Sequence, residues 1–99
     1  MKHVFHPEAL AEYEAAARYY AERDPTVAVR FVDAVQDAIR RIADAPHRWR
    51  VVEDDIRRCL THVFPYSVLY CAEPDRVFIL AVMHCSRRPG YWKARASRR

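Results

Sequence analysis

The pattern of apolar and polar residues predicts helices in the first half of this chain and mainly strands in the second half. Residues 7–23 repeat large apolar side chains at spacings of three and four, which is typical of an amphipathic helix. Asp24 and Pro25 then supply an N-cap and a first-turn proline, and a second apolar stripe follows over residues 28–42. Because almost no loop separates the two helices, we expect an antiparallel hairpin that ends before Pro46.

The second half of the chain predicts strands instead of helices. Short β-prone segments are separated by turn residues or by a connector, and they cover residues 49–52, 56–63, 66–72 and 76–83. A weaker strand signal precedes the first helix at residues 2–6. With 49–52 as a candidate extra strand, the order is β-α-α-β-β-β. We therefore predict an α+β fold, in which an antiparallel sheet carries the two-helix hairpin on one face.

The segment 76–83 is apolar on both of its faces. Regular alternation groups Val77, Ile79, Ala81 and Met83 on one face, and Phe78, Leu80 and Val82 on the other. A strand without a polar face usually lies inside a sheet that is covered on both sides. The hairpin can cover one side, so we expect a partner to cover the other.

Length and charge indicate one small domain, residues 1–99, with an uneven electrostatic field. Ninety-nine residues that are 52% hydrophobic suffice for one modest core. Residues 84–99 form a basic C-terminal segment with six Lys or Arg and no acid, while the first 83 residues hold eleven basic and thirteen acidic ones. This segment favours a polyanion or an acidic protein partner. For Arg98 and Arg99 a solvated, frayed tail is the better interpretation.

Composition argues against metals, cofactors and membranes. The three cysteines are odd in number and form no CxxC, so neither a disulfide framework nor a zinc site is indicated. The single glycine, Gly90, excludes a glycine-rich phosphate loop. The first residues lack the apolar core of a signal peptide, and the apolar run 77–83 is too short to span a bilayer. We expect a cytoplasmic protein with reduced thiols, without cofactor or metal.

Chemically versatile residues gather where segment 76–83 ends. His84 can serve as a general acid or base, or as a rim histidine that bonds to backbone. Arg87 and Arg88 follow, and Arg57 and Arg58 begin another strand. Arginines that converge on one edge can bind phosphates or the carboxylates of a partner, and the sequence leaves both open.

The residues after this cluster combine a turn with two aromatic rings. Gly90 after Pro89 predicts a turn with positive φ. Tyr91 and Trp92 can stack on nucleic-acid bases or fold back onto the core, and packing is favoured for Trp92. Cys85 beside His84 suggests a nucleophile, but no third member or oxyanion element is evident, so a Cys–His hydrolase is disfavoured.

Several sequence blocks occur in order across nearly the whole chain. They are ALAEYEAAARYY at 9–20, RF at 30–31, IADAPHR at 42–48, IRR at 56–58, FPYSVLY at 64–70 and AVMHCSRRPGYWKAR at 81–95. On these blocks the chain resembles the RelE/ParE superfamily of type II toxins, closest to its ParE-like plasmid stabilisation branch. The resemblance implies the same β-α-α-β-β-β fold. It also implies a hetero-oligomer with a cognate antitoxin, whose acidic, disordered segment folds on binding and silences the toxin.

The resemblance implies two different mechanisms. RelE-like members are ribosome-dependent mRNA endonucleases, and the candidate catalytic set for that mechanism is Arg57, His84, Arg87 and Tyr91. Their catalytic lysines have no counterpart, because Lys2 and Lys93 lie elsewhere in the pattern. This departure favours a non-enzymatic, ParE-like toxin that binds and poisons DNA gyrase. A degenerate, non-toxic binding module is the third hypothesis. In each case target or antitoxin contacts are expected at Arg57, Arg58, His84, Arg87, Arg88, Tyr91, Trp92 and Arg95.

Overall fold

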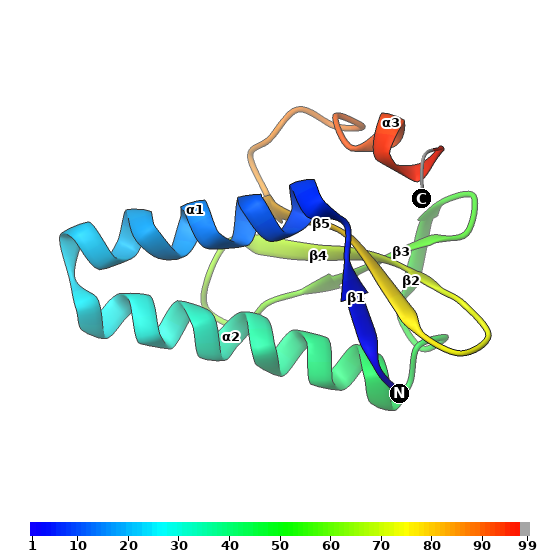
Figure 1. Cartoon of the computed structure of the whole chain (residues 1–99), viewed down its shortest axis with the longest axis horizontal. Helices are drawn as coiled ribbons and strands as arrows, with labels where there is room; N and C mark the ends of the chain where they lie inside the picture. Colours follow the sequence, from blue (N-terminus) through cyan, green and yellow to red (C-terminus); the bar gives the residue numbers. More distant parts are fainter. Residues whose placement is uncertain (98–99) are drawn as a thin grey trace.

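The computed structural model describes residues 1–97, which form a two-helix hairpin and a five-stranded mixed sheet (Figure 1). The elements are β1 (His3–Phe5), α1 (Pro7–Arg23), α2 (Pro25–Asp44), β2 (Arg50–Glu53), β3 (Ile56–Leu60), β4 (Tyr66–Ala72), β5 (Val77–His84) and α3 (Lys93–Ala96). Arg98 and Arg99, the end of the basic C-terminal segment, lie outside the described residues. The predicted α+β class is confirmed. No helix within residues 1–97 is long and apolar enough to cross a membrane.

The helical hairpin begins and turns where the sequence predicts. The Nδ1 atom of His6 accepts a hydrogen bond from the Glu8 N–H at 3.0 Å, just before α1. Asp24 serves both helices, because its N–H donates to the Tyr20 carbonyl at 2.8 Å and its carboxylate accepts from the Thr26 N–H at 3.0 Å. One residue therefore ends α1 and caps α2, which brings the two helices side by side (Figure 1).

The strands follow the order β1-β5-β4-β3-β2, which places β5 inside the sheet as expected. The candidate strand at 49–52 is real and forms the edge strand β2, while β3 ends at Leu60, three residues short of its predicted end. The sheet is mixed and not wholly antiparallel, because β1 pairs with β5 in parallel. In the sequence the hairpin and strands β2, β3 and β4 all separate β1 from β5, which gives the long connection that a parallel pair requires.

Strand β5 does not alternate regularly, so the predicted division of its side chains is wrong beyond Leu80. The pairing with β4 skips one residue of β5, as the successive pairs show: Tyr70 with Ile79, then Leu69 with Ala81. Leu80 is thus the extra residue of a β-bulge. In consequence Leu80 and Ala81 both belong to the core away from the helices, whereas Val82 belongs to the helix-side core.

The two faces of the sheet carry separate apolar cores. The helix-side core joins hairpin residues such as Phe31 and Val35 to Tyr70 and Ile79 of the sheet. The far-face core consists of Ile56, Leu69, Cys71, Phe78, Leu80, Ala81 and Trp92. Tyr91 and Ala96 pack against this second core. The chain's own C-terminal residues therefore cover part of the face for which only a partner was expected, and the packing role of Trp92 is confirmed.

Candidate functional site

The carboxylate of Glu12 on α1 holds the C-terminal segment, defined here as residues 85–97. Its Oε1 atom accepts hydrogen bonds from the Val82 N–H at 3.1 Å and from Nη1 of Arg95 at 2.8 Å. Its Oε2 atom accepts from the Tyr91 hydroxyl at 2.5 Å and from Nη2 of Arg95 at 3.0 Å. Arg95 also donates to the Leu80 carbonyl at 3.2 Å. Strand β1 pairs with β5 only up to Ile79. Beyond it, the backbone groups of Leu80 and Val82 form hydrogen bonds with the side chains of Arg95 and Glu12.

Burial and charge shift the pKa values of Tyr91 and Arg95 in this cluster. Burial, together with the hydrogen bond to Glu12 and its negative charge, raises the pKa of the Tyr91 hydroxyl above its ordinary value. Burial lowers the pKa of Arg95, but the hydrogen bond and charge of Glu12 outweigh it, so the pKa is raised overall. Tyr91 therefore stays neutral, and Arg95, only 7% exposed, stays charged. Both side chains stabilise the fold by holding the C-terminal segment against α1.

Arg57 lies on the helix-side face of β3, apart from the C-terminal segment. Its partner in β4 is Tyr70, a residue of the helix-side core. Its Nη1 atom donates to the carbonyls of His47 at 3.1 Å and Trp49 at 2.7 Å. The guanidinium thereby fixes the connector that leads from α2 to β2.

His84 ends β5 on the helix-side face, opposite Tyr66 and four residues along β4 from Tyr70, the partner of Arg57. Its Nδ1 atom accepts a hydrogen bond from the Ser86 N–H at 3.0 Å, and its ring meets the Tyr66 ring edge-on at 5.1 Å between centroids. This is the rim position considered as an alternative. Arg87 and Tyr91 are in contact, with the guanidinium carbon 3.9 Å from the ring centroid. The structure thus brings together only two members of the ribonuclease set.

A basic hollow of about 330 Å³, here called the far-face cleft, lies between the sheet and the C-terminal segment. Arg58, Arg87 and Lys93 supply its positive charges, and Glu53 is its one acidic residue. Nε of Arg58 donates to Ser67 Oγ at 2.9 Å, which fixes this guanidinium on the far face. A hollow with this charge suits carboxylates or phosphates.

Gly90 shapes the wall of the far-face cleft. Its φ of 79° confirms the predicted positive-φ turn. A Cβ at this position would lie 2.8 Å from Cε of Lys93. Glycine thereby lets the Lys93 side chain cross the turn and pair with Glu53 at 3.1 Å.

The structure places only some of the residues predicted to contact a target or antitoxin at the far-face cleft. Those that line the far-face cleft are Arg58, Arg87 and Trp92. Arg88 is exposed beside it, and those that lie elsewhere are Arg57, His84, Tyr91 and Arg95. Sequence reasoning missed Glu12 and Lys93. For Glu12 a signal was present, because it follows Ala9 by three residues and precedes Ala16 by four, so it lies on the buried face of α1.

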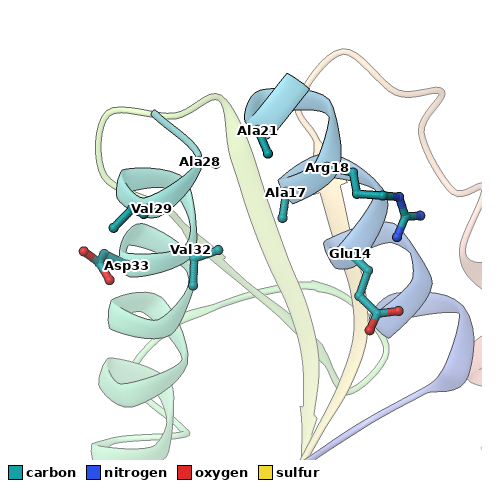
Figure 2. Close-up of a pocket in the computed structure, with 8 residues that line it drawn as sticks. All are labelled: Glu14, Ala17, Arg18, Ala21, Ala28, Val29, Val32 and Asp33. Atoms are coloured by element: carbon teal, nitrogen blue, oxygen red, sulfur yellow. The ribbon is translucent and has the colours of Figure 1, made fainter. Parts of the chain in front are cut away.

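Among the hollows outside this cleft, two are considerably larger. One, of about 560 Å³, lies between α1 and α2 (Figure 2) and is lined by Ala17, Ala21, Ala28, Val29 and Val32, with Glu14, Arg18 and Asp33 around them. The other, of about 650 Å³, lies beside the turn between β3 and β4 and contains Arg41, Arg50, Arg58 and His62. Across residues 1–97 no group of three or more His, Cys, Asp or Glu could hold a metal ion.

Comparisons with known proteins give one consistent result. The family model described as ParE toxin of type II toxin–antitoxin system, parDE, matches residues 4–89. Among solved structures, a chain described as a chromosomal ParDE TA system from P. aeruginosa is similar, with a TM-score of 0.73 and 15% identity. The match covers 85% of this chain and 95% of that one, and at this identity it shows the fold alone. No curated protein matches the chain significantly.

Proposed function

The chain belongs to the ParE toxin family of type II toxin–antitoxin systems, and from this premise we propose that it arrests growth by binding and poisoning DNA gyrase. A cognate antitoxin keeps it silent, and both act in the cytoplasm. The observation that carries the proposal is the family match over residues 4–89. The gyrase target goes beyond that match and is the part that experiment must test.

The toxin acts by binding and not as a nuclease. In support of this, Arg57 is engaged with two backbone carbonyls on the helix-side face, and the Tyr91 hydroxyl is bonded to Glu12. His84 lies at the rim of the helix-side core beside Tyr66, four residues along β4 from Tyr70, the strand partner of Arg57. General acid–base catalysis needs groups within hydrogen-bond reach of one reacting atom, and these side chains point to separate places.

The antitoxin contacts the far-face cleft. Arg58, Arg87 and Lys93 offer cationic groups there, and Arg88 is exposed beside them. Guanidinium groups bind carboxylates in bidentate fashion. An acidic segment that orders on binding therefore suits this surface better than it suits the hollow between the helices, whose lining is mainly alanine and valine.

A supercoiling assay with purified toxin and gyrase tests the target. We expect supercoiling to fall and cleaved DNA to accumulate as toxin is added, and the same titration with toxin saturated by antitoxin serves as the control. Full gyrase activity at saturating toxin contradicts the proposal. Inducible expression separates the alternatives, since early loss of DNA synthesis indicates gyrase and cleaved mRNA indicates a RelE-like nuclease. Harmless expression indicates a binding module.

A further inference from the structure

Val29 is exposed beside the hollow that lies between α1 and α2 (Figure 2). It is 61% exposed and belongs to neither core of the fold. One exposed valine is common on a protein surface, but this valine stands beside a floor that is also apolar. The floor consists of Ala17, Ala21, Ala28 and Val32. Continuous apolar surface of this kind often marks a site of interaction with another molecule.

The hollow, of about 560 Å³, has a cause in the sequence. Most residues of its floor are alanines, whose side chains are too short to fill the space between the two helices. At one end the helices are joined through Asp24. Toward the other end, Nε2 of Gln36 donates to the Tyr13 hydroxyl at 3.0 Å and links α2 to α1. An apolar recess of about two helical turns therefore opens on the outer side of the hairpin.

Charged side chains of both signs border this recess. Figure 2 shows Glu14 and Arg18 extending from α1 on one side and Asp33 from α2 on the other. The ion pairs described within residues 1–97 include none of these three residues. With two acids and one arginine, this surface does not suit an acidic antitoxin segment. It complements a partner that carries both signs, and a second copy of the same surface meets that requirement.

A two-fold axis along the recess, parallel to the helices, pairs these charges. Rotation about it places α1 of one copy on α2 of the other, so each contact occurs twice. Heights along the hairpin are counted from Asp24, where the helices meet. Arg18 precedes Asp24 by six residues and Asp33 follows it by nine, so their heights differ by three residues, or about 4.5 Å. An arginine side chain spans that distance, and Arg18 therefore reaches the partner's Asp33.

The same rotation brings the apolar residues into register. Val29 follows Asp24 by five residues, whereas Ala21 and Ala17 precede it by three and seven. Val29 therefore comes level with the midpoint between the partner's Ala17 and the partner's Ala21, where the small side chains leave room. Side chains inserted in this way between residues of a facing helix are typical of helical bundles. One symmetry operation thus satisfies both charge and shape.

We propose that two copies of the chain associate through the outer sides of their helical hairpins, as a weak two-fold homodimer. Helix α1 has 17 residues and is thus about 25 Å long, and two helices side by side are about 20 Å wide. Each copy thereby contributes about 500 Å². The total of about 1,000 Å² lies at the low end for specific interfaces, so we expect a Kd on the order of 10–100 µM.

The proposed dimer leaves the far-face cleft open, because the hairpin covers the opposite face of the sheet (Figure 1). Each copy can therefore hold an antitoxin at the cleft while it contacts the other copy. The inference goes beyond the proposed function and depends neither on toxicity nor on gyrase. At about 1 µM the chain is monomeric, so unfolding experiments at that concentration report on the monomer.

Sedimentation equilibrium of the purified chain between about 1 and 200 µM tests the interface. We expect a monomer–dimer equilibrium, in which Val29→Asp, Arg18→Glu and Asp33→Arg each raise the Kd at least about fivefold. The matched controls are Val51→Asp and Arg50→Glu, both at exposed positions of the edge strand β2. They leave the Kd within about twofold. Circular dichroism confirms that each variant is folded.

An exchange of charges identifies the pairs. Arg18→Glu together with Asp33→Arg restores opposite charges across the two-fold axis, so the Kd returns to within about threefold of that of the unaltered chain. Glu14→Arg together with Arg18→Glu also preserves the net charge, but it leaves a glutamate facing the partner's Asp33. This second double variant therefore keeps the weakened association.

Four results overturn the inference. They are a chain that stays monomeric up to the highest concentration, a dimer that Val29→Asp does not weaken, equal weakening by the two β2 controls, and recovery in the Glu14→Arg double variant instead of the Asp33→Arg one. The gyrase assay is separate from all four. A dimer without effect on gyrase contradicts the proposed function alone, whereas a gyrase poison that is monomeric throughout contradicts the inference alone.

Discussion

Val63 and Glu12 each occupy an environment that is unusual for their residue type. Val63 is aliphatic, 84% exposed and held at a φ of 72°. Glu12 is acidic, yet its side chain is only 16% exposed. Glu12 is explained by its partners, because its carboxylate accepts hydrogen bonds from Val82, Tyr91 and Arg95. Packing within residues 1–97 does not explain Val63, and this contrast directs attention to a partner.

Replacing Val63 by glycine tests the strain. Relief of a strained residue of this kind is worth about 1–3 kcal/mol, and glycine's larger loss of chain entropy offsets about 0.5–1 kcal/mol. We expect Val63→Gly to raise the free energy of unfolding by roughly 1 kcal/mol in urea titrations. Val51→Gly, at an exposed strand position with ordinary φ, serves as control and lowers it. Equal losses in both variants contradict a strained turn.

Buried tyrosines predict a loss of stability at high pH. Burial raises the pKa of Tyr66 to about 12, and burial also raises the pKa of Tyr70, whose hydroxyl donates to the Pro46 carbonyl at 2.6 Å. In the unfolded chain the pKa is about 10. The folded chain therefore keeps protons that the unfolded chain releases above pH 10, so stability is full below that pH and falls as pH rises toward 12.

Tyr70→Phe isolates this effect. The variant lacks one hydroxyl whose pKa differs between the folded and unfolded chains. Its free energy of unfolding should therefore decrease less steeply above pH 10, by up to about 1.4 kcal/mol per pH unit. Melting curves between pH 7 and pH 12 measure it. Tyr19→Phe, at a residue that is 52% exposed, is the matched control. An unaltered slope in Tyr70→Phe rules out this residue as a source of the alkaline loss.

At the scale of elements, the features that the sequence predicted correctly depend on interactions between residues close in the chain. The features that it did not predict depend on contacts between distant segments. The caps at His6 and Asp24 and the helical spacing act within a few residues, so both helices were predicted closely. The bulge at Leu80 and the parallel register of β1 depend on strands far apart in the chain. No local pattern encodes them.

The same division applies to the candidate site. Arg58 and Arg87 could be predicted because they stand out as charged residues beside apolar strand segments, Arg58 within β3 and Arg87 three residues after β5. Arg57 was placed with them because it adjoins Arg58 in the sequence, but successive strand residues point to opposite faces. The roles of Glu12 and Lys93 depend on partners far away in sequence, namely Arg95 and Glu53.

Asp24 offers a test of how one residue joins two elements. Its carboxylate caps α2 by accepting from the Thr26 N–H at 3.0 Å. Asp24→Ala removes that hydrogen bond, and we expect the free energy of unfolding to fall by about 1 kcal/mol. Asp24→Ser keeps a capping oxygen and restores most of it. Asp33→Ala, on an exposed part of α2, is the matched control. If Asp33→Ala is as harmful as Asp24→Ala, capping is not the cause.

At the scale of the whole molecule, the C-terminal segment completes the fold. Trp92 closes the far-face core, and Arg95 reaches across to Glu12 on α1 and to the Leu80 carbonyl in β5. The first helix, the inner strand and the last residues are thereby joined at one carboxylate. The far-face cleft exists only while this segment is in place, since Pro89, Gly90, Trp92 and Lys93 form part of its lining.

Glu12→Gln tests this junction. The change keeps the shape of the side chain but leaves Arg95, whose side chain is 9% exposed, without its close counter-ion. Loss of one partner of a buried ion pair costs about 3–5 kcal/mol, and we expect that decrease in the free energy of unfolding from urea titrations.

The double variant Glu12→Gln, Arg95→Met distinguishes an unpaired charge from lost packing. It removes the buried charge, so it should be more stable than Glu12→Gln alone, because replacing a whole buried pair is far less harmful than breaking it. Glu14→Gln, at an exposed position of the same helix, is the control and changes stability by less than about 0.5 kcal/mol. A double variant less stable than Glu12→Gln would mean that Arg95 stabilises the segment through its own contacts with Leu80 and Tyr91, independently of Glu12.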